Sequence, residues 1–291
     1  MGRNRTQSRT SHRSRFFSTR MSTHVIWVNG ELLESSTPSL SANDHGFLLG
    51  DGIFDTLLVR DRKPVFFTRH LRRLRSGIDR LLIENAPTDD QLANAMSQLL
   101  EANNLVDARV RITVTPGSGI SALERGALPL TVMTAVPLGT KPSSVSLCTV
   151  EWVRNERSPL AGLKSTSWGE NASILRFARS NGFDNAILFD STGRLSECTT
   201  SNLYLVIDQQ IVTPTLDSGC LPGIIREVLL EKGIATERDL FPSDLAQATA
   251  VFITSSITGV VPVHRVDKLQ FAEDSQQTAA ANDVIENLSA S

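Results

Sequence analysis

The chain has 291 residues, of which 40% are hydrophobic and 21% are charged, and this is the composition of an ordinary globular protein. The formal net charge of −2 hides a division, because residues 1–20 contain six arginines and no acid, which leaves −8 on the rest of the chain. The net negative charge of residues 21–291 excludes nonspecific nucleic-acid binding, which needs clustered lysine and arginine. No apolar run reaches the roughly 18 to 20 residues of a membrane span, so we expect no membrane partner.

Residues 1–20 form a leading segment that is rich in Arg, Ser and Thr and has no hydrophobic periodicity. A transit peptide for a plastid or mitochondrion has this composition, and so does a disordered basic tail that contacts an acidic partner. A third interpretation is an upstream start codon, with Met21 as the true first residue, because a strand-like run begins soon after it. We favour this third interpretation and expect a cytoplasmic protein with the segment outside the fold.

The first half of the chain reads as strands with two helices. Asn29-Gly30 between two short apolar runs predicts a β-hairpin turn. Apolar residues at helical spacing predict two helices, the second opening on a threonine cap. The expected strands are Val25–Val28, Glu31–Leu33, Ile53–Arg60, Val65–Phe67, Arg109–Thr115 and Leu130–Ala135, and the expected helices are His70–Leu82 and Thr88–Glu101.

The second half continues with both kinds of element. Two prolines and a glycine within Pro137–Pro142 predict the connection between two domains. We therefore predict an α+β fold with an N-terminal α/β domain at residues 21–140 and a second domain at residues 141–291. The expected strands are Val145–Val150, Asn185–Phe189, Leu203–Val206, Ile211–Val212 and Ala250–Thr254, and the expected helices are Glu170–Ser180, Pro222–Glu231, a short one after Ser243 and one after about Phe271.

The cysteines and histidines give no sign of a disulfide framework or a metal centre. The chain has three cysteines, which are far apart and form no C-x-x-C pair. The five histidines are scattered too, and no pair has the spacing of metal ligands. We therefore predict free thiols in a reducing compartment and no metal.

Lys164 and Glu197 are the residues that point most directly to chemistry. A lysine amine can form a Schiff base with a carbonyl cofactor, and a carboxylate can keep a pyridine nitrogen protonated. These are the two groups that pyridoxal phosphate needs, because the imine makes it an electrophile and the protonated ring makes it an electron sink. Most lysines are solvated surface residues, so the interpretation depends on the neighbouring motifs.

Three further segments match a known pattern in the same order along the chain. Gly50–Thr56 is similar to a G-D-G-[VI]-F-E-T signature, His70–Leu74 to an H-[LIM]-x-R-L helix and Gly223–Arg226 to a G-I-[TM]-R helix start. With Lys164 and Glu197 they make five ordered matches, and together these are far more specific than any one alone. On these residues the chain resembles the fold-type IV (class IV) pyridoxal phosphate enzymes over nearly everything after the leading segment.

The resemblance implies a D-amino acid aminotransferase-like fold in two domains, with the cofactor between them and bound chiefly by the C-terminal domain. It implies that Lys164 is the catalytic residue, which holds pyridoxal phosphate and then acts as the base. Such a lysine works best when a desolvated, cationic pocket lowers its pKa. Glu197 would stay ionised against the ring nitrogen.

The resemblance also implies how the phosphate is bound. Arg73 takes the position at which the family places a phosphate-binding arginine, and a guanidinium fork suits that task. The backbone N–H groups of Ile224 and Ile225 would bind the phosphate at a helix start. Relatives often carry threonine where Ile225 stands, so here only the backbone contact remains. Ser256 would supply a further phosphate contact.

Neighbouring residues are expected to have structural roles. Gly50-Asp51-Gly52 would shape the pocket wall, and Asn202 would hold the loop of Glu197. Arg72 and Arg75 are expected to form a solvated basic face of their helix.

The choice of reaction depends on the substrate pocket. Leu160–Lys164 is similar to the L-A-G-[IL]-K run of aminodeoxychorismate lyases, and Lys164–Asn171 to the K-S-T-S-[YW]-G-E-N run of related actinobacterial sequences. Thr115–Gly117 lacks the arginine that D-amino acid aminotransferases use for a substrate carboxylate. Leu49 and Gly169 replace tyrosines of branched-chain aminotransferases. We therefore expect 4-amino-4-deoxychorismate lyase, which makes 4-aminobenzoate and pyruvate in folate synthesis.

Two alternatives stay open. One is a class IV aminotransferase that acts on D-amino or branched-chain amino acids with 2-oxoglutarate. The other is a non-catalytic cofactor carrier or scaffold, against which the presence of both Lys164 and Glu197 argues. The resemblance further implies a homodimer that takes a small amino substrate.

Overall fold

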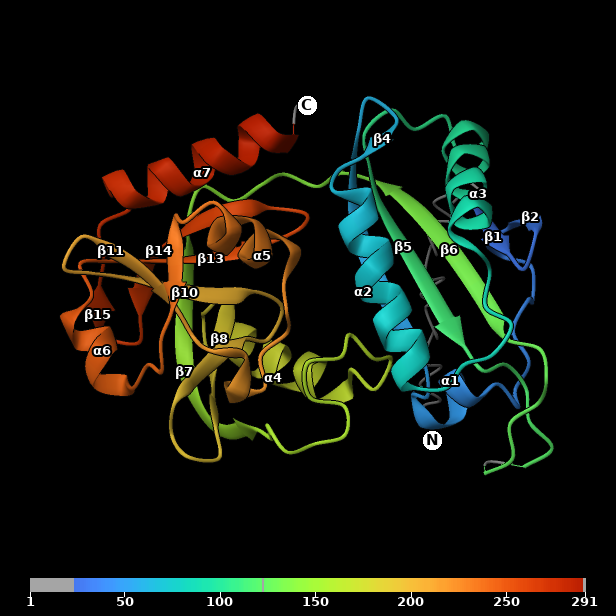
Figure 1. Cartoon of the computed structure of the whole chain (residues 1–291), viewed down its shortest axis with the longest axis horizontal. Coiled ribbons are helices and arrows are strands. Elements are labelled where there is room, and N and C mark those ends of the chain that lie inside the picture. The colour runs from blue at the N-terminus through green and yellow to red at the C-terminus, as the bar shows by residue number, and fades with distance from the viewer. Residues whose placement is uncertain (1–23, 122, 290–291) are drawn as a thin grey trace, which may run out of the picture.

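The computed structural model describes residues 24–121 and 123–289, so the interpretations of the leading segment 1–20 lie outside the described residues. The described chain forms two parts, each built around its own β-sheet and joined by residues 138–144 (Figure 1). Both parts combine a sheet with packed helices, which confirms the predicted α+β class in two domains. The exact boundary at residues 140 and 141 falls in the joining segment and stays a prediction.

The first part holds a six-stranded antiparallel sheet in the order β2-β1-β6-β5-β3-β4. Asn29 and Gly30 close the β1–β2 hairpin and both have positive φ, as the turn requires. The elements of this part are β1 (Val25–Val28), β2 (Glu31–Glu34), α1 (His45–Leu49), β3 (Ile53–Arg60), β4 (Lys63–Pro64), α2 (Phe67–Arg80), α3 (Asp89–Ala102), β5 (Ala108–Thr115) and β6 (Leu130–Pro137).

Helices α2 and α3 cover one face of this sheet and build the first hydrophobic core. Leu74 and Ile78 of α2 meet Leu99 of α3 and the buried side chains of β3 and β5. Helix α3 begins with a capping box between Thr88 and Gln91, in agreement with the predicted start. The other face of β3 and β5 is left for the second part of the molecule.

Helix α2 begins earlier than predicted. We expected a strand over Val65–Phe67, and this prediction is wrong. The backbone at Phe66 is left-handed with φ 54°, which ends the extended chain and lets the helix begin at Phe67. The result moves three more side chains onto the helix.

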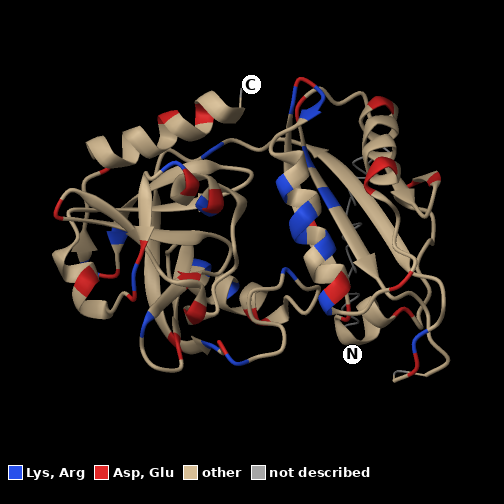
Figure 2. Cartoon of the chain, in the orientation of Figure 1, with Lys and Arg blue, Asp and Glu red and all other residues tan. Residues whose placement is uncertain are grey.

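Helix α2 also presents its basic side to the second part of the molecule (Figure 2). Arg69 and Arg72 both contact Glu227 across the gap. At the other end Arg80 donates a hydrogen bond to the backbone oxygen of Ala161 at 2.9 Å. Arg72, which we expected to be a solvated surface residue, stays exposed but takes part in this contact.

The second part holds a nine-stranded mixed sheet in the order β12-β11-β10-β13-β14-β7-β8-β9, with β15 paired to β14. Strand β7 is parallel to both of its neighbours, β8 and β14. The elements are β7 (Val145–Arg154), α4 (Gly169–Ser180), β8 (Asn185–Asp190), β9 (Leu195–Cys198), β10 (Asn202–Ile207), β11 (Gln210–Thr213), a 3₁₀ turn (Leu216–Ser218), α5 (Ile224–Glu231), β12 (Ala235–Glu237), α6 (Pro242–Gln247), β13 (Ala250–Ser255), β14 (Gly259–Val266), β15 (Leu269–Gln270) and α7 (Gln276–Ser289).

The helices of the second part pack on its sheet in separate places. Helices α5 and α7 share a core with β10 and β13, around the stacked rings of Tyr204 and Phe252. Helix α4 packs through Ile174 and Ala178 on β7 and β8. The three cysteines are free and buried within this part. No helix in residues 24–121 or 123–289 has both the length and the apolar character that a bilayer crossing demands.

Candidate active site

A cavity of about 500 Å³ lies between the two parts of the molecule. The first part contributes β3, β5 and α2 to its wall, and the second part contributes the Lys164 loop, α4, the segment from β9 to β10, the start of α5 and the region where β13 turns into β14. The structure places all six predicted site residues on this wall, whereas the sequence separates them widely; they are Arg73, Lys164, Glu197, Ile224, Ile225 and Ser256. Their individual roles stay predictions.

The loop of Lys164 is held against the start of β3. The backbone oxygen of Lys164 accepts a hydrogen bond from the N–H of Phe54 at 2.9 Å, and the N–H of Thr166 donates to Gly52 at 2.8 Å. A Cβ on Gly50 would lie 2.9 Å from the Cα of Ser167 in the lysine loop, which is closer than real side chains come. The Gly50-Asp51-Gly52 motif therefore lets this strand and the lysine loop approach each other.

The amine of Lys164 lies in an aromatic and cationic environment. Its Nζ is 4.6 Å from the centre of the Phe54 ring and 5.1 Å from that of Trp168. Burial, together with the positive charge of Arg73, lowers the pKa of Lys164 from its ordinary value to about 8. A minor fraction of the amine is therefore neutral near physiological pH, far more than for an ordinary lysine, and can act as a nucleophile or a base.

This pKa leads to a testable pH dependence. We expect the apo-protein to capture pyridoxal phosphate faster as the pH rises, with a midpoint at about 8, because only the neutral amine of Lys164 attacks an aldehyde. Stopped-flow absorbance of apo-protein mixed with the cofactor at a series of pH values would measure it. A midpoint at 10.5, the ordinary lysine value, would contradict the desolvated site.

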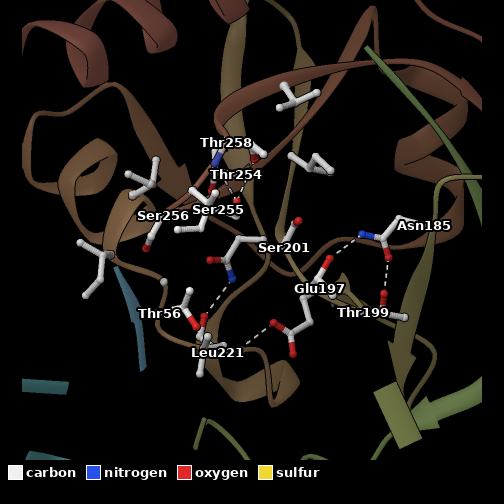
Figure 3. A pocket seen from close by; sticks show the side chains of 18 of the residues that line it. Thr56, Asn185, Glu197, Thr199, Ser201, Leu221, Thr254, Ser255, Ser256 and Thr258 are labelled. Carbon is white, nitrogen blue, oxygen red and sulfur yellow. Dashed lines mark hydrogen bonds between the residues drawn. The ribbon is translucent and has the colours of Figure 1, made fainter. Parts of the chain in front are cut away.

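Glu197 is buried on the opposite wall, in β9. One carboxylate oxygen accepts a hydrogen bond from the N–H of Leu221 at 3.0 Å, as Figure 3 shows, and the other lies 3.1 Å from a guanidinium nitrogen of Arg154. Burial raises the pKa of Glu197, and the charge of Arg154 opposes that rise. The site thus carries an acid whose ionisation depends on its neighbours.

Arg73 is held by a buried carboxylate on β3. Its Nε and Nη2 donate to the two oxygens of Asp55 at 2.9 and 2.7 Å, and Nδ1 of His70 lies 2.9 Å from the same group. Burial alone would raise the pKa of Asp55, but Arg73 and His70 hold it well below its usual range. The third nitrogen of Arg73 donates to the backbone oxygen of Pro222 at 3.2 Å, which brings the guanidinium next to the start of α5.

The start of α5 and the β13–β14 loop form a polar pocket beside Arg73. Ile224 and Ile225 occupy the first turn of α5, whose N–H groups have no acceptor within the helix. Ser256 lies in the β13–β14 loop close to Thr254, whose hydroxyl is buried without a hydrogen-bond partner among the described residues (Figure 3). Free N–H groups, hydroxyls and a guanidinium are together suited to bind a phosphate.

Asn202 has a structural contact, but with the segment before α5 and not directly with the loop of Glu197 as expected. Its side-chain N–H donates to the backbone oxygen of Leu221 at 2.8 Å. A Cβ on Gly223 would lie 1.9 Å from the side-chain oxygen of Asn202. Glycine at the N-cap of α5 is therefore required for the helix to begin this close to β10.

Sequence reasoning missed Arg179 of α4 and two arginines of β5, Arg109 and Arg111, which all line the cavity. None of the three has an ion-pair partner in the part of the chain that the structure describes, although Arg111 lies 3.6 Å over the Phe54 ring. Burial and the charge of Arg109 lower the pKa of Arg111. The alternation of buried Val110 and Ile112 with the arginines of β5 was a visible signal, because period-two residues share one face of a strand.

These residues fit pyridoxal phosphate. A partly neutral lysine, a buried carboxylate and a polar pocket suited to a phosphate, with the unsatisfied hydroxyl of Thr254, lie around one cavity of suitable size. Within residues 24–121 and 123–289, His, Cys, Asp and Glu form no group of three or more that could hold a metal ion.

Comparison with known proteins supports this reading. The sequence matches the profile of the family described as amino-transferase class IV over residues 52–266. It is 29% identical over 260 residues to a provisionally assigned branched-chain-amino-acid aminotransferase of Methanocaldococcus jannaschii, covering 83% of this chain and 88% of that one. It is 26% identical over 270 residues to aminodeoxychorismate lyase of Bacillus subtilis, covering 88% and 92%.

Solved structures show the same fold. A provisionally assigned 4-amino-4-deoxychorismate lyase from Legionella pneumophila superposes with a TM-score of 0.83 at 26% identity. The superposition covers 87% of this chain and 97% of that one.

Proposed function

Because the chain belongs to the class IV aminotransferase family, whose enzymes depend on pyridoxal phosphate, we propose that it is a 4-amino-4-deoxychorismate lyase. The reaction would convert 4-amino-4-deoxychorismate to 4-aminobenzoate and pyruvate. The observation that carries the proposal is the pair Arg109 and Arg111 on the cavity wall. The substrate has two carboxylates, and neither arginine has an acid to pair with in the described chain. Arg179 of α4 is a third cavity arginine without such a partner there, but it belongs to the other half of the molecule.

The position of Arg111 relative to Lys164 supports the proposal. The guanidinium of Arg111 and the amine of Lys164 contact the same Phe54 ring, at 3.6 and 4.6 Å from its centre. A carboxylate bound by Arg111 therefore lies close to the group that would act as base. The aromatic side chains of Phe54 and Trp168 suit a planar, unsaturated ring better than a short aliphatic side chain.

The residues then divide the work as follows. Arg73, the start of α5 and Ser256 would hold the phosphate, and the amine of Lys164 would hold the cofactor covalently at its aldehyde carbon. The cofactor supplies an electron sink for the carbanion beside the substrate nitrogen. Lys164 removes the proton from that carbon, and Glu197 holds a proton at the ring nitrogen. Loss of the enolpyruvyl group leaves an aromatic amine, and the released enol becomes pyruvate.

Two incubations test the assignment. Purified holoprotein with 4-amino-4-deoxychorismate should release 4-aminobenzoate and pyruvate in equal amounts. The same protein with amino acids and 2-oxoglutarate should transfer the amino group slowly or not at all. Rapid transfer without 4-aminobenzoate would overturn the lyase and leave the family assignment intact.

The second candidate is a class IV aminotransferase acting on branched-chain or D-amino acids with 2-oxoglutarate. The observation in its favour is the similarity to a provisionally assigned branched-chain aminotransferase, at 29% identity. Arg111 would then serve the second carboxylate of 2-oxoglutarate. The hydroxyl-rich wall formed by Thr199, Thr200 and Ser255 is less suited to an aliphatic side chain.

We expect Arg111→Gln to raise KM for 4-amino-4-deoxychorismate about 10- to 100-fold with a smaller change in kcat, because it removes a charge-assisted hydrogen bond made before the chemical step. Steady-state kinetics would measure both constants. Arg60→Gln, which removes only an exposed ion pair with Asp107, is the matched control. An unchanged KM in Arg111→Gln would contradict the carboxylate contact.

We further propose a homodimer. Helix α1 and the loop after β5 lie together, since Asn43 and Gly119 share a backbone hydrogen bond, and both expose large apolar side chains. Ile120 and Leu123 are 92% and 91% exposed, and Phe47 of α1 is 72% exposed. Such a surface is suited to association with a second copy. Sedimentation of the purified protein as a monomer at micromolar concentration would contradict it.

A further inference from the structure

Arg154 lies beside Glu197 and has no part in the roles described above. It ends β7, and its Nη2 is 3.1 Å from Oε1 of Glu197. The two side chains are only 16% and 9% exposed. In the described part of the chain, Glu197 is the one acid within ion-pair distance of Arg154, so this carboxylate balances its charge.

Asn171 links Arg154 to the loop that carries Glu197. Asn171 is buried in the first turns of α4, where its side-chain oxygen accepts from Nη1 of Arg154 at 3.3 Å. Its side-chain N–H donates to the backbone oxygen of Thr199 at 2.7 Å. The contacts therefore close a ring through β7, α4 and the segment after β9, which fixes the guanidinium and the carboxylate relative to each other. They also give a physical reason for asparagine at the end of the Lys164–Asn171 motif.

The ionisation of Glu197 depends on this contact. Burial raises the pKa of Glu197, and Arg154 is the strongest opposing influence, ahead of the Leu221 N–H, Lys164 and Arg226. A neutral carboxyl donates a hydrogen bond to a pyridine nitrogen, whereas a carboxylate accepts one from its N–H. Removing Arg154 would thus change the ionisation of Glu197 and leave the N–H of Leu221 as its hydrogen-bond partner.

We propose that Arg154, braced by Asn171, is a positioning residue that keeps Glu197 ionised and fixed so that the ring nitrogen of pyridoxal phosphate stays protonated. The proposal rests on the role given to Glu197 and not on the identity of the substrate. A purely structural role for Arg154 would instead be to neutralise a buried acid for the sake of folding. Only the positioning role makes the effect of Arg154 on cofactor binding depend on the ring nitrogen.

The 1-deaza analogue of pyridoxal phosphate separates these roles, because a C–H replaces the ring nitrogen and Glu197 has no proton to hold there. Apo-protein of the wild type and of Arg154→Gln would be titrated with each cofactor and the dissociation constants measured. The wild type should prefer pyridoxal phosphate over the analogue. Arg154→Gln should weaken binding of pyridoxal phosphate about 10-fold, as expected for loss of a charged contact, and leave analogue binding nearly unchanged.

Further variants make the result specific. Arg154→Lys, which keeps the charge, should retain most of the preference, and Asn171→Ala should lose part of it. Arg238→Gln, which removes an exposed ion pair with Asp244 in the same half, should change neither constant. The absorption spectrum of bound pyridoxal phosphate should shift in Arg154→Gln and not in Arg238→Gln, because a neutral ring absorbs differently.

The outcomes are distinct. If Arg154→Gln weakened the binding of both cofactors equally, Arg154 would have a structural role and the proposal would be overturned. An unchanged preference of Arg154→Gln for pyridoxal phosphate over the analogue would overturn it too. If the wild type bound both cofactors equally well, the role of Glu197 would be wrong and this proposal with it. The proposed lyase activity would then still be judged by its own assay. Should Arg154→Gln fail to fold, a full preference in Asn171→Ala would still overturn the proposal.

Discussion

Replacing Lys164 with alanine should reduce turnover by about 10³-fold or more, because it removes both the covalent attachment of the cofactor and the base. The structure makes a substitute unavailable nearby, since the other cations on this wall are arginines, which do not give up a proton near neutral pH. Reduction of the holoprotein with borohydride, followed by peptide mass analysis, should find a pyridoxyl group at position 164 in the wild type and none in the variant.

The control for this experiment is a lysine outside the cavity. Lys63 is exposed on β4, and Lys63→Ala should keep full activity and the full borohydride adduct. Because the amine of Lys164 sits against Phe54 and Trp168, its removal leaves a small apolar space and should not unfold the protein. Equal turnover by Lys164→Ala and wild type would disprove enzymatic use of this cavity and favour a non-catalytic cofactor carrier.

Glu197→Gln should lower kcat by about 10²- to 10³-fold, the range found when one preorganised electrostatic contact to developing charge is removed. Glutamine keeps the size of the side chain and can still accept from the N–H of Leu221, so the loop should stay in place. The loss should fall on kcat more than on KM, because the ring charge matters most when the carbanion forms. Steady-state kinetics with each variant would measure it.

Glu151→Gln provides the comparison, since Glu151 is an exposed residue of β7 in the same half. It should leave kcat unchanged. If Glu197→Gln kept the kcat of the wild type, the ring nitrogen would not need a partner, and the assignment of Glu197 would be wrong. Glu197→Gln also leaves the charge of Arg154 unbalanced, so its thermal stability should be measured beside its kinetics.

Local signals predicted much of the fold. Asn29-Gly30 specified a hairpin, and Thr88 with Gln91 specified the start of α3, because in each case the deciding contacts lie within a few residues. Strand β14 was missed, since Pro262 lies inside it and proline usually argues against a central strand. Its tertiary pairing with β13 and β7 overrides that preference.

The residues of the candidate site were likewise predictable only where a local motif marks them. Residues in motifs were found from the sequence, and the structure places them around one cavity. Arg111 was missed because its face of β5 becomes a cavity wall only when the second half packs opposite it. Arg154 was missed because β7 was predicted to end at Val150, whereas it continues to Arg154 and brings this side chain to Glu197.

Helix α2 joins the two halves at three places along one side: Arg69 reaches α5, Arg73 reaches Pro222 and Arg80 reaches Ala161. The proposed phosphate pocket is therefore complete only in the docked arrangement of the halves. A ligand that binds only this arrangement stabilises it by mass action. We therefore expect the supply of pyridoxal phosphate in the cell to set how firmly the two halves are held together, as well as how many molecules carry the cofactor.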